Sequence, residues 1–201
     1  MKRFSAIILI LLFILTGILF YGYFNRVKIS SYLLTQAFRV HSSISSIDLN
    51  VKNSNCTFHH LEVQNPKPAK KPTALKAEKI TIKAPYINYL KNPINIDEIH
   101  LDNLFINIEI YNESYSKGNW QTLLSNLNKD HEGSFSIDRS AKIKTLLFTN
   151  IHIHIVLSNG KSYDLAPIKR LEFENISSEK GFPIYEVTEI ITQRLVEAIF
   201  K

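Results

Sequence analysis

The stretch from Pro93 to Leu124 organises this chain, because it holds the longest alternating run of apolar residues. Leu104, Ile106, Ile108 and Ile110 occupy every second position, and polar or aromatic residues fall between them. Alternation with a period of two places the apolar side chains on one face of a β-strand and the others on the opposite face. The run therefore predicts a strand whose apolar face is buried.

A shorter apolar unit precedes this run and interrupts its parity. Ile96, Ile99 and Leu101 form the unit, with two-residue gaps at 97–98 and 102–103. Each gap would turn the apolar side chains from one face of a regular strand to the other. We therefore expect a bulge, a bend or a turn at both gaps.

The same unit recurs along the chain, so strand pieces are repeated. Four copies have an asparagine two residues after the last apolar position, and the copies beginning at Ile96 and Ile143 both continue into longer alternating runs. The six copies are Ile44-Ile47-Leu49, Phe58-Leu61-Val63, Ala77-Ile80-Ile82, Ile96-Ile99-Leu101, Ile143-Leu146-Phe148 and Ile168-Leu171-Phe173. Chance matches in any β-rich chain are the alternative, but six copies favour a degenerate repeat. Their irregular spacing argues against a strict solenoid.

An uncharged apolar segment lies near the N-terminus, at residues 4–24. It matches the roughly 20 residues that a bilayer-spanning helix needs. A cleaved signal peptide is the alternative, but Tyr21, Tyr23 and Phe24 stand where small residues would mark a cleavage site. We therefore predict an uncleaved single-pass anchor. Basic residues on both sides give only a slight bias, towards a cytoplasmic N-terminus and export of the remaining chain.

Two short motifs accompany these strands. The sequence VQNP occupies residues 63–66, and GNWQTLL occupies residues 118–124. Together with the anchor and the strand units, they resemble the first domain of the AsmA-like family of bacterial envelope proteins. That resemblance implies a periplasmic domain with a role in lipid homeostasis, lipid transport or outer-membrane biogenesis. It implies no catalytic residue.

We expect an α+β fold that is mainly β. An N-terminal transmembrane helix leads into a curved, mostly antiparallel sheet with flanking amphipathic helices. The cytoplasmic stub and anchor would cover residues 1–26. The exported domain would cover residues 27–201, with helices over 27–40, 120–127 and 183–200. About eight strands at a spacing of ~4.8 Å predict a sheet ~40 Å wide, more than its own C-terminal helix could cover.

The apolar face of this sheet is the candidate binding surface for a lipid or a partner protein. The candidates are Leu104, Ile106, Ile108, Ile110, Ile151, Ile153 and Ile155. Lys67, Lys70 and Lys71 lie in a proline-rich loop and are candidates for lipid head groups. A solvated loop whose lysines prevent edge-to-edge aggregation is the simpler alternative, which we favour.

The chain offers little for catalysis. His152 and His154 share one strand face, but the sequence places no third metal ligand beside them. Cys56 is the only cysteine and has no recognisable catalytic context. We expect no enzymatic activity and no cofactor. The formal charge of +6 is modest, and with the expected location it disfavours nucleic-acid binding.

The expected function is therefore that of a membrane-anchored, non-enzymatic envelope protein. Its partners would be the inner membrane, a phospholipid or other envelope lipid, and an envelope protein. An adaptor domain that docks a partner protein is the main alternative. A histidine-based enzyme ranks lower, and so does a eukaryotic water-stress protein of the LEA type.

Overall fold

The computed structural model describes residues 22–114, 116–127, 140–177, 190–194 and 196, and strands make up about half of this part. A helix covers residues 22–38, and residues 190–194 are also helical. The other elements are β1 (Ser42–Ser43), β2 (Ser46–Asn50), β3 (Asn55–Gln64), β4 (Thr73–Lys83), the 3₁₀ helix η1 (Tyr86–Leu90), β5 (Ile94–Glu109), α2 (Asn119–Leu127), β6 (Ala141–Val156), β7 (Ser162–Asp164) and β8 (Ile168–Ser177).

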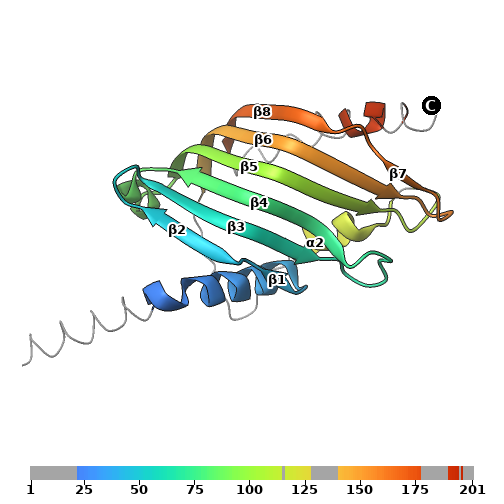
Figure 1. The fold of residues 1–201 in the computed structure, drawn as a ribbon, viewed down its shortest axis with the longest axis horizontal. Helices are drawn as coiled ribbons and strands as arrows, with labels where there is room; N and C mark the ends of the chain where they lie inside the picture. The colour runs from blue at the N-terminus through green and yellow to red at the C-terminus, as the bar shows by residue number, and fades with distance from the viewer. Residues whose placement is uncertain (1–21, 115, 128–139, 178–189, 195, 197–201) are drawn as a thin grey trace, which may run out of the picture.

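The eight strands of the described residues all belong to one open, mixed sheet (Figure 1). The central order is β3-β4-β5-β6, while β1 and β2 share the outer edge of β3, and β7 and β8 share that of β6. The expected number of strands is therefore correct, but the expected width is wrong. Because β1 and β2 lie end to end along β3, and β7 and β8 along β6, the sheet is only six strands wide, which is roughly 24 Å between its edge strands.

The two longest strands, β5 and β6, are parallel, and every other pairing is antiparallel. They carry the two extended copies of the repeated unit. Ile96 pairs with Ile143, and Ile108 pairs with Ile155, so equivalent positions of the two copies are direct neighbours along the whole ladder. The internal repeat in the sequence therefore matches the register in which β5 and β6 pair.

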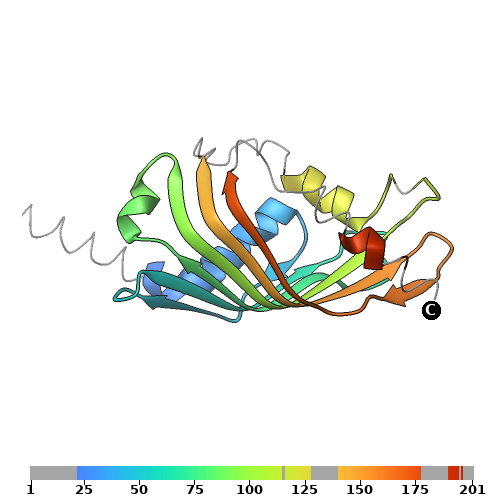
Figure 2. The same ribbon diagram turned by 90° about the horizontal axis from the view of Figure 1, so that it is seen from above.

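The sheet is curved into a trough, and the helices lie on its concave side (Figure 2). The helix over residues 22–38 runs beside β1 and β2, and hydrogen bonds fasten it there. The Arg26 guanidinium donates to the Ile47 carbonyl at 2.9 Å, and the Ile44 amide donates to the Ser31 hydroxyl at 3.1 Å. The amphipathic helix expected over 27–40 is present, with bounds shifted towards the N-terminus.

Apolar side chains of the concave face form the buried core with these helices. Leu123 of α2 is 1% exposed, and Leu34 and Phe38 of the N-terminal helix pack against the same cluster. Each fully buried residue of this kind stabilises the fold by roughly 1.5–3 kcal/mol. The core is therefore shared between the sheet and the helices in the trough.

Three expected helices have different outcomes. The one expected over residues 120–127 is α2, which begins at Asn119. The one expected over 183–200 is seen at 190–194, and its remaining positions lie largely outside the described residues. Residues 128–139 also lie outside them. None of the described helices combines the length and the apolar composition of a bilayer-spanning segment. The expected anchor, residues 4–24, lies almost entirely outside that part.

Candidate functional site

Apolar residues on the concave face line up in rows that cross the sheet. Residues paired in register lie on the same face, so each row is continuous from strand to strand. Three rows, which we call the core rows, are Leu61–Ala77–Leu104–Ile151–Ile168, Val63–Leu75–Ile106–Ile153 and Ile108–Ile155. Three more, the outer rows, are Phe58–Ile80–Leu101–Phe148–Leu171, Cys56–Ile82–Ile99–Leu146–Phe173 and Ile96–Ile143–Ile176.

A crease separates the core rows from the outer rows. At His60, Asn103 and Asn150 the backbone is left-handed, with φ of 49°, 52° and 51°. Pairing skips these residues and resumes without a change of register on the far side. The second parity gap predicted for β5 is therefore confirmed as a bend that β3, β5 and β6 share. Asparagine and histidine are among the residues that most often adopt this conformation.

The crease explains how both sets of rows face the concave side. Leu101 and Leu104 are three positions apart, so a regular strand would point them to opposite faces. Both nevertheless contact the same core cluster. The first parity gap, at residues 97–98, also interrupts the regular pairing. The ladder skips Asp97 of β5, Lys144 of β6 and Asn175 of β8. The sequence pattern that looked irregular thus produces one uninterrupted apolar face.

Polar side chains on the strands next to the crease hold it in place. The Thr149 hydroxyl donates to Asp102 Oδ1 at 2.5 Å, and Asn150 Nδ2 donates to the same oxygen at 3.0 Å. These hydrogen bonds, that of Thr149 above all, hold the pKa of Asp102 below its usual value. On the other side, Asn103 Nδ2 donates to Glu78 Oε2 at 2.5 Å.

The outer rows differ from the core rows in exposure. Every outer-row residue except Leu146 stays partly accessible to solvent. Ile82, Ile99 and Phe173 are not among the residues packed against the core cluster. Phe173 instead meets Phe148 edge to face, with ring centroids 6.2 Å apart. The outer rows are thus an apolar surface that the described helices leave incompletely covered.

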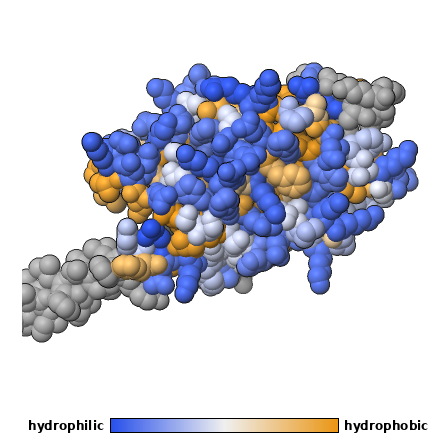
Figure 3. Space-filling view, in the orientation of Figure 1, coloured by the Kyte–Doolittle hydropathy of each residue, from blue (hydrophilic) through white to orange (hydrophobic). Residues whose placement is uncertain are grey.

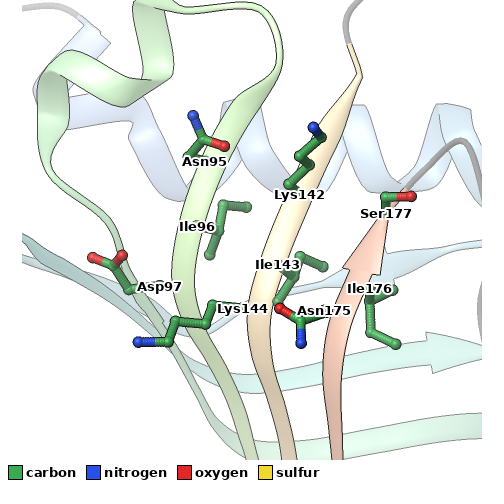
Figure 4. Close-up of a pocket in the computed structure, with 9 residues that line it drawn as sticks. All are labelled: Asn95, Ile96, Asp97, Lys142, Ile143, Lys144, Asn175, Ile176 and Ser177. Carbon is green, nitrogen blue, oxygen red and sulfur yellow. The ribbon is translucent and has the colours of Figure 1, made fainter.

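A pocket of about 360 Å³ lies where the outermost row reaches the ends of β5, β6 and β8 (Figure 4). Its lining residues are Asn95, Ile96, Asp97, Lys142, Ile143, Lys144, Asn175, Ile176 and Ser177. Three isoleucines supply an apolar wall, while the lysines, the aspartate and the amides supply polar groups around it. The pocket therefore joins an apolar surface to groups of both charges.

Most of the predicted lipid-facing or partner-facing residues lie in the core rows. Leu104, Ile151, Ile153 and Ile155 are between 2% and 5% exposed. Ile106, Ile108 and Ile110 are partly buried and pack against the same cluster. The structure brings all seven together on one face, as expected. The accessible apolar surface lies across the crease from them, in residues that the sequence analysis did not select.

The predicted head-group residues lie in the loop between β3 and β4. Lys67, Lys70 and Lys71 are all exposed. The loop is at the end of the sheet opposite the start of the N-terminal helix (Figure 1). Glu109, which is 2% exposed, fastens it there, because its carboxylate accepts the amides of Lys70 at 2.7 Å and Lys71 at 2.8 Å.

The two short motifs of the sequence meet at this loop. Asn119 is completely buried, and its Nδ2 donates to Asn65 Oδ1 at 2.7 Å and to the Asn107 carbonyl at 2.7 Å. Its Oδ1 accepts the Glu109 amide at 2.8 Å. The Trp120 indole donates to the Asn107 carbonyl at 2.9 Å. The motif residues are therefore structural, since they join the β3–β4 loop, the end of β5 and the start of α2.

The histidines that the structure describes do not assemble a recognisable reaction centre. His152 is exposed, whereas His154 is partly buried and its Nδ1 lies 2.6 Å from Asp164 Oδ1. Among the described residues, no group of three or more histidine, cysteine or acidic side chains could hold a metal ion. Cys56 is a free thiol in an outer row, and burial raises its pKa, which favours the protonated, less nucleophilic form.

Besides the outer rows, sequence reasoning missed a second accessible feature, the 3₁₀ helix η1. Tyr86, Ile87 and Leu90 of η1 are exposed, and Leu90 reaches 80%. The only sequence signal is a run of apolar and aromatic residues between Pro85 and Pro93, without helical or strand periodicity.

Comparisons with known proteins give no family or relative by which the fold or the site could be interpreted. The sequence matches no known family model, and a comparison with curated proteins finds no match.

Proposed function

We propose that this chain is a non-enzymatic, membrane-anchored protein of the bacterial envelope that holds the acyl chains of a lipid against the outer rows. The observation that carries the proposal is the accessibility of these rows. They continue the apolar face beyond the crease, but helix side chains cover them less completely than the core rows. An accessible apolar surface of this kind marks a binding site for an apolar ligand or partner.

The pocket supports a lipid in particular. A phospholipid has apolar chains and a charged head group, and the pocket sets Lys142 and Lys144 beside the isoleucine row. The ammonium groups would pair with phosphate oxygens, while the chains would follow the apolar rows across the sheet. A purely apolar partner would leave these charged groups unused.

The location is part of the same proposal. The apolar segment at residues 4–24 would anchor the chain in the inner membrane, with its N-terminus in the cytoplasm and residues 27–201 in the periplasm. The resemblance to the AsmA-like family favours lipid transport or outer-membrane biogenesis. The contact between the VQNP and GNWQTLL motifs supports that resemblance, because it gives both motifs a shared structural role.

Native mass spectrometry of the detergent-solubilised full chain tests lipid binding. Ile82→Gln places an amide in an outer row, and Thr81→Gln is the matched control on the opposite face of the same strand. The wild type and Thr81→Gln should retain phospholipid, and Ile82→Gln should lose most of it. Equal lipid content in the three proteins would contradict the proposal. It would leave a structural or adaptor domain that docks an envelope protein as the better account.

Reporter fusions test the topology. A reporter placed after Lys201 should be active in the periplasm, and the mature protein should keep its first residues. A mature chain that begins near Asn25 would show cleavage and would contradict the anchor.

A further inference from the structure

One end of the sheet concentrates exposed apolar side chains. Of the large hydrophobic residues that are exposed in the described part of the chain, about half lie at this end. They come from the start of the N-terminal helix, from the β2–β3 hairpin and from η1. The seven residues, which we call the apolar end, are Tyr23, Phe24, Leu49, Val51, Tyr86, Ile87 and Leu90. Figure 3 shows one area of hydrophobic colouring at the left, where η1 and the β2–β3 hairpin lie, and further such areas elsewhere on the same face.

Hydrogen bonds fix the three elements of the apolar end to one another. Tyr86 of η1 donates from its hydroxyl to the Asn55 carbonyl at 3.3 Å, and the Ala84 amide donates to the Ser54 carbonyl at 3.1 Å. Arg26 of the N-terminal helix donates to the Ile47 carbonyl of β2 at 2.9 Å. The exposed residues are therefore held on one structured surface.

Their exposure is high for residues of this type. Leu90 is 80% exposed, Val51 is 74% exposed and Phe24 is 67% exposed. Leaving such side chains in water forgoes the stabilisation that burial would give, roughly 1.5–3 kcal/mol for each. Scattered single residues of this kind are ordinary, but a group carried by three adjoining elements indicates an interaction surface.

The chemistry of the apolar end fits a membrane interface. Two tyrosines combine an apolar ring with a polar tip, which suits the boundary between acyl chains and water. Lys28 and Lys52 are exposed at the same end and would face anionic head groups. Lys83 also lies here, in an ion pair of 2.9 Å with Glu98. A soluble partner protein would not require this combination.

The opposite end of the sheet has a different character. Its described loops, 65–72, 112–118 without residue 115, and 157–161, contain no large hydrophobic residue that is exposed. They carry exposed lysines instead, among them Lys67, Lys70 and Lys161. The two ends of the sheet therefore differ. The other large hydrophobic residues that are exposed in the described part all lie on helices, and they are Ile29, Tyr32, Leu33, Leu124, Leu127 and Val196.

The position of the N-terminal segment indicates what covers the apolar end. The described helix begins at Gly22, at the apolar end (Figure 1), and the apolar segment 4–24 leads directly into it. A chain anchored by that segment would bring this end of the sheet to the membrane surface. We propose that the apolar end docks on the bilayer interface, with η1 and the β2–β3 hairpin immersed by roughly 5–10 Å, as interfacial elements are. This inference rests on the anchoring proposed above and not on lipid binding by the outer rows.

Such docking would set the orientation of the domain. The long strands would rise from the bilayer, with the apolar end in the interface and the β3–β4 loop pointing away. A strand of 16 residues such as β5 spans roughly 50 Å at ~3.3 Å per residue. The mouth of the pocket at the first residues of β5 would then lie near the membrane, where lipid is available.

Fluorescent labels on the full-length chain test this orientation. Single cysteines would be introduced as Leu90→Cys in η1, Val51→Cys in the β2–β3 turn, and Asn159→Cys in the β6–β7 turn as the control at the far end, all with Cys56→Ala. Each would carry an environment-sensitive fluorophore. The labelled chains would be reconstituted in vesicles of phosphatidylglycerol and phosphatidylcholine in equal amounts, with and without spin-labelled phosphatidylcholine as a quencher.

Labels at positions 90 and 51 should show a blue shift and lose their fluorescence to the quencher, and the label at 159 should do neither. Vesicle-bound chains whose three labels all remain in water would overturn the docking alone. A blue shift without quenching at 90 and 51 would assign the surface to a protein contact and would overturn it too. A chain that separates from the vesicles on flotation would overturn both the anchor and the docking.

Discussion

The side chain of Asn119 is hydrogen bonded to the side chain of Asn65, which lies 54 positions earlier in the sequence. The bond is 2.7 Å long and joins the start of α2 to the loop that leaves β3. The Asn119 side chain is also hydrogen bonded to the end of β5, where it donates to the Asn107 carbonyl and accepts from the Glu109 amide. One buried amide therefore connects three elements that are separate in the sequence.

Removal of this amide should destabilise the domain. Asn119→Ala would leave the buried Glu109 amide without its acceptor and would take one of two side-chain donors from the Asn107 carbonyl, which keeps the Trp120 indole, at a cost of about 3 kcal/mol. For a chain of this size that corresponds to a fall in melting temperature of roughly 6–12 °C, measurable by circular dichroism in detergent. Asn53→Ala, an exposed control, should stay close to the wild type. Equal melting temperatures for both variants would contradict the role of Asn119.

Gly118 is required by a close approach of two backbone segments. A Cβ atom at this position would lie 2.4 Å from the Glu109 carbonyl oxygen, which β5 holds in place. Gly118→Ala should therefore lower the melting temperature although alanine is otherwise a favourable residue. Gly22→Ala is the matched control, because a Cβ atom there meets nothing within 4 Å, and alanine stabilises a helix relative to glycine. A Gly118→Ala protein as stable as Gly22→Ala would refute this explanation.

The left-handed backbone of the crease makes a prediction at His60. Because φ is 49° there, a β-branched residue should be strained and a glycine should be tolerated. His60→Val should lose about 1–2 kcal/mol of stability, and His60→Gly should match the wild type or exceed it. Thermal unfolding of the pair measures the difference. The reverse order of stability would show that the crease does not depend on this conformation.

The crease should also respond to acid through Asp102. Its pKa is lowered in the folded protein, chiefly by the Thr149 hydroxyl, so the ionised form stabilises the fold. This contribution is present above the ordinary value of 3.8 and is lost as the pH falls through the lower folded-state pKa. Thr149→Val should therefore flatten the dependence of the melting temperature on pH below about 4. A Thr149→Val protein with the full acid dependence of the wild type would contradict this assignment.

Much of the sheet can be predicted from sequence because strands and bends are marked by patterns within short segments of the chain. Alternation at residues 104–110 marks the strand, and the parity gaps mark the bends. The repeat even contains the register, since Ile96 and Ile143 are equivalent in sequence and adjacent in space. The asparagines that follow the repeated units are informative for a physical reason: Asn103 and Asn150 adopt the left-handed conformation that turns the apolar pattern back to one face.

The parts that sequence could not predict depend on distant segments. Nothing local to Asn107 or Glu109 shows that they are buried, because a loop from about 40 positions earlier and the start of α2 cover them. The division between core rows and outer rows has the same origin, since helices at other points of the chain decide which rows are covered. The sheet is narrower than expected because β2 and β7 are short enough to share an edge with another strand.

Photo-crosslinking at Ile99 tests whether the outer rows bind lipid. A photoreactive amino acid would be placed at Ile99, in an outer row, or at His100, its neighbour on the opposite face, in the full-length chain in living cells. After irradiation, the mass of the purified protein reports what lay against each position. If lipid lies against the outer rows, a phospholipid adduct should form at position 99 and none at position 100. An adduct with a protein at position 99, or no lipid adduct there, would contradict lipid binding by the outer rows.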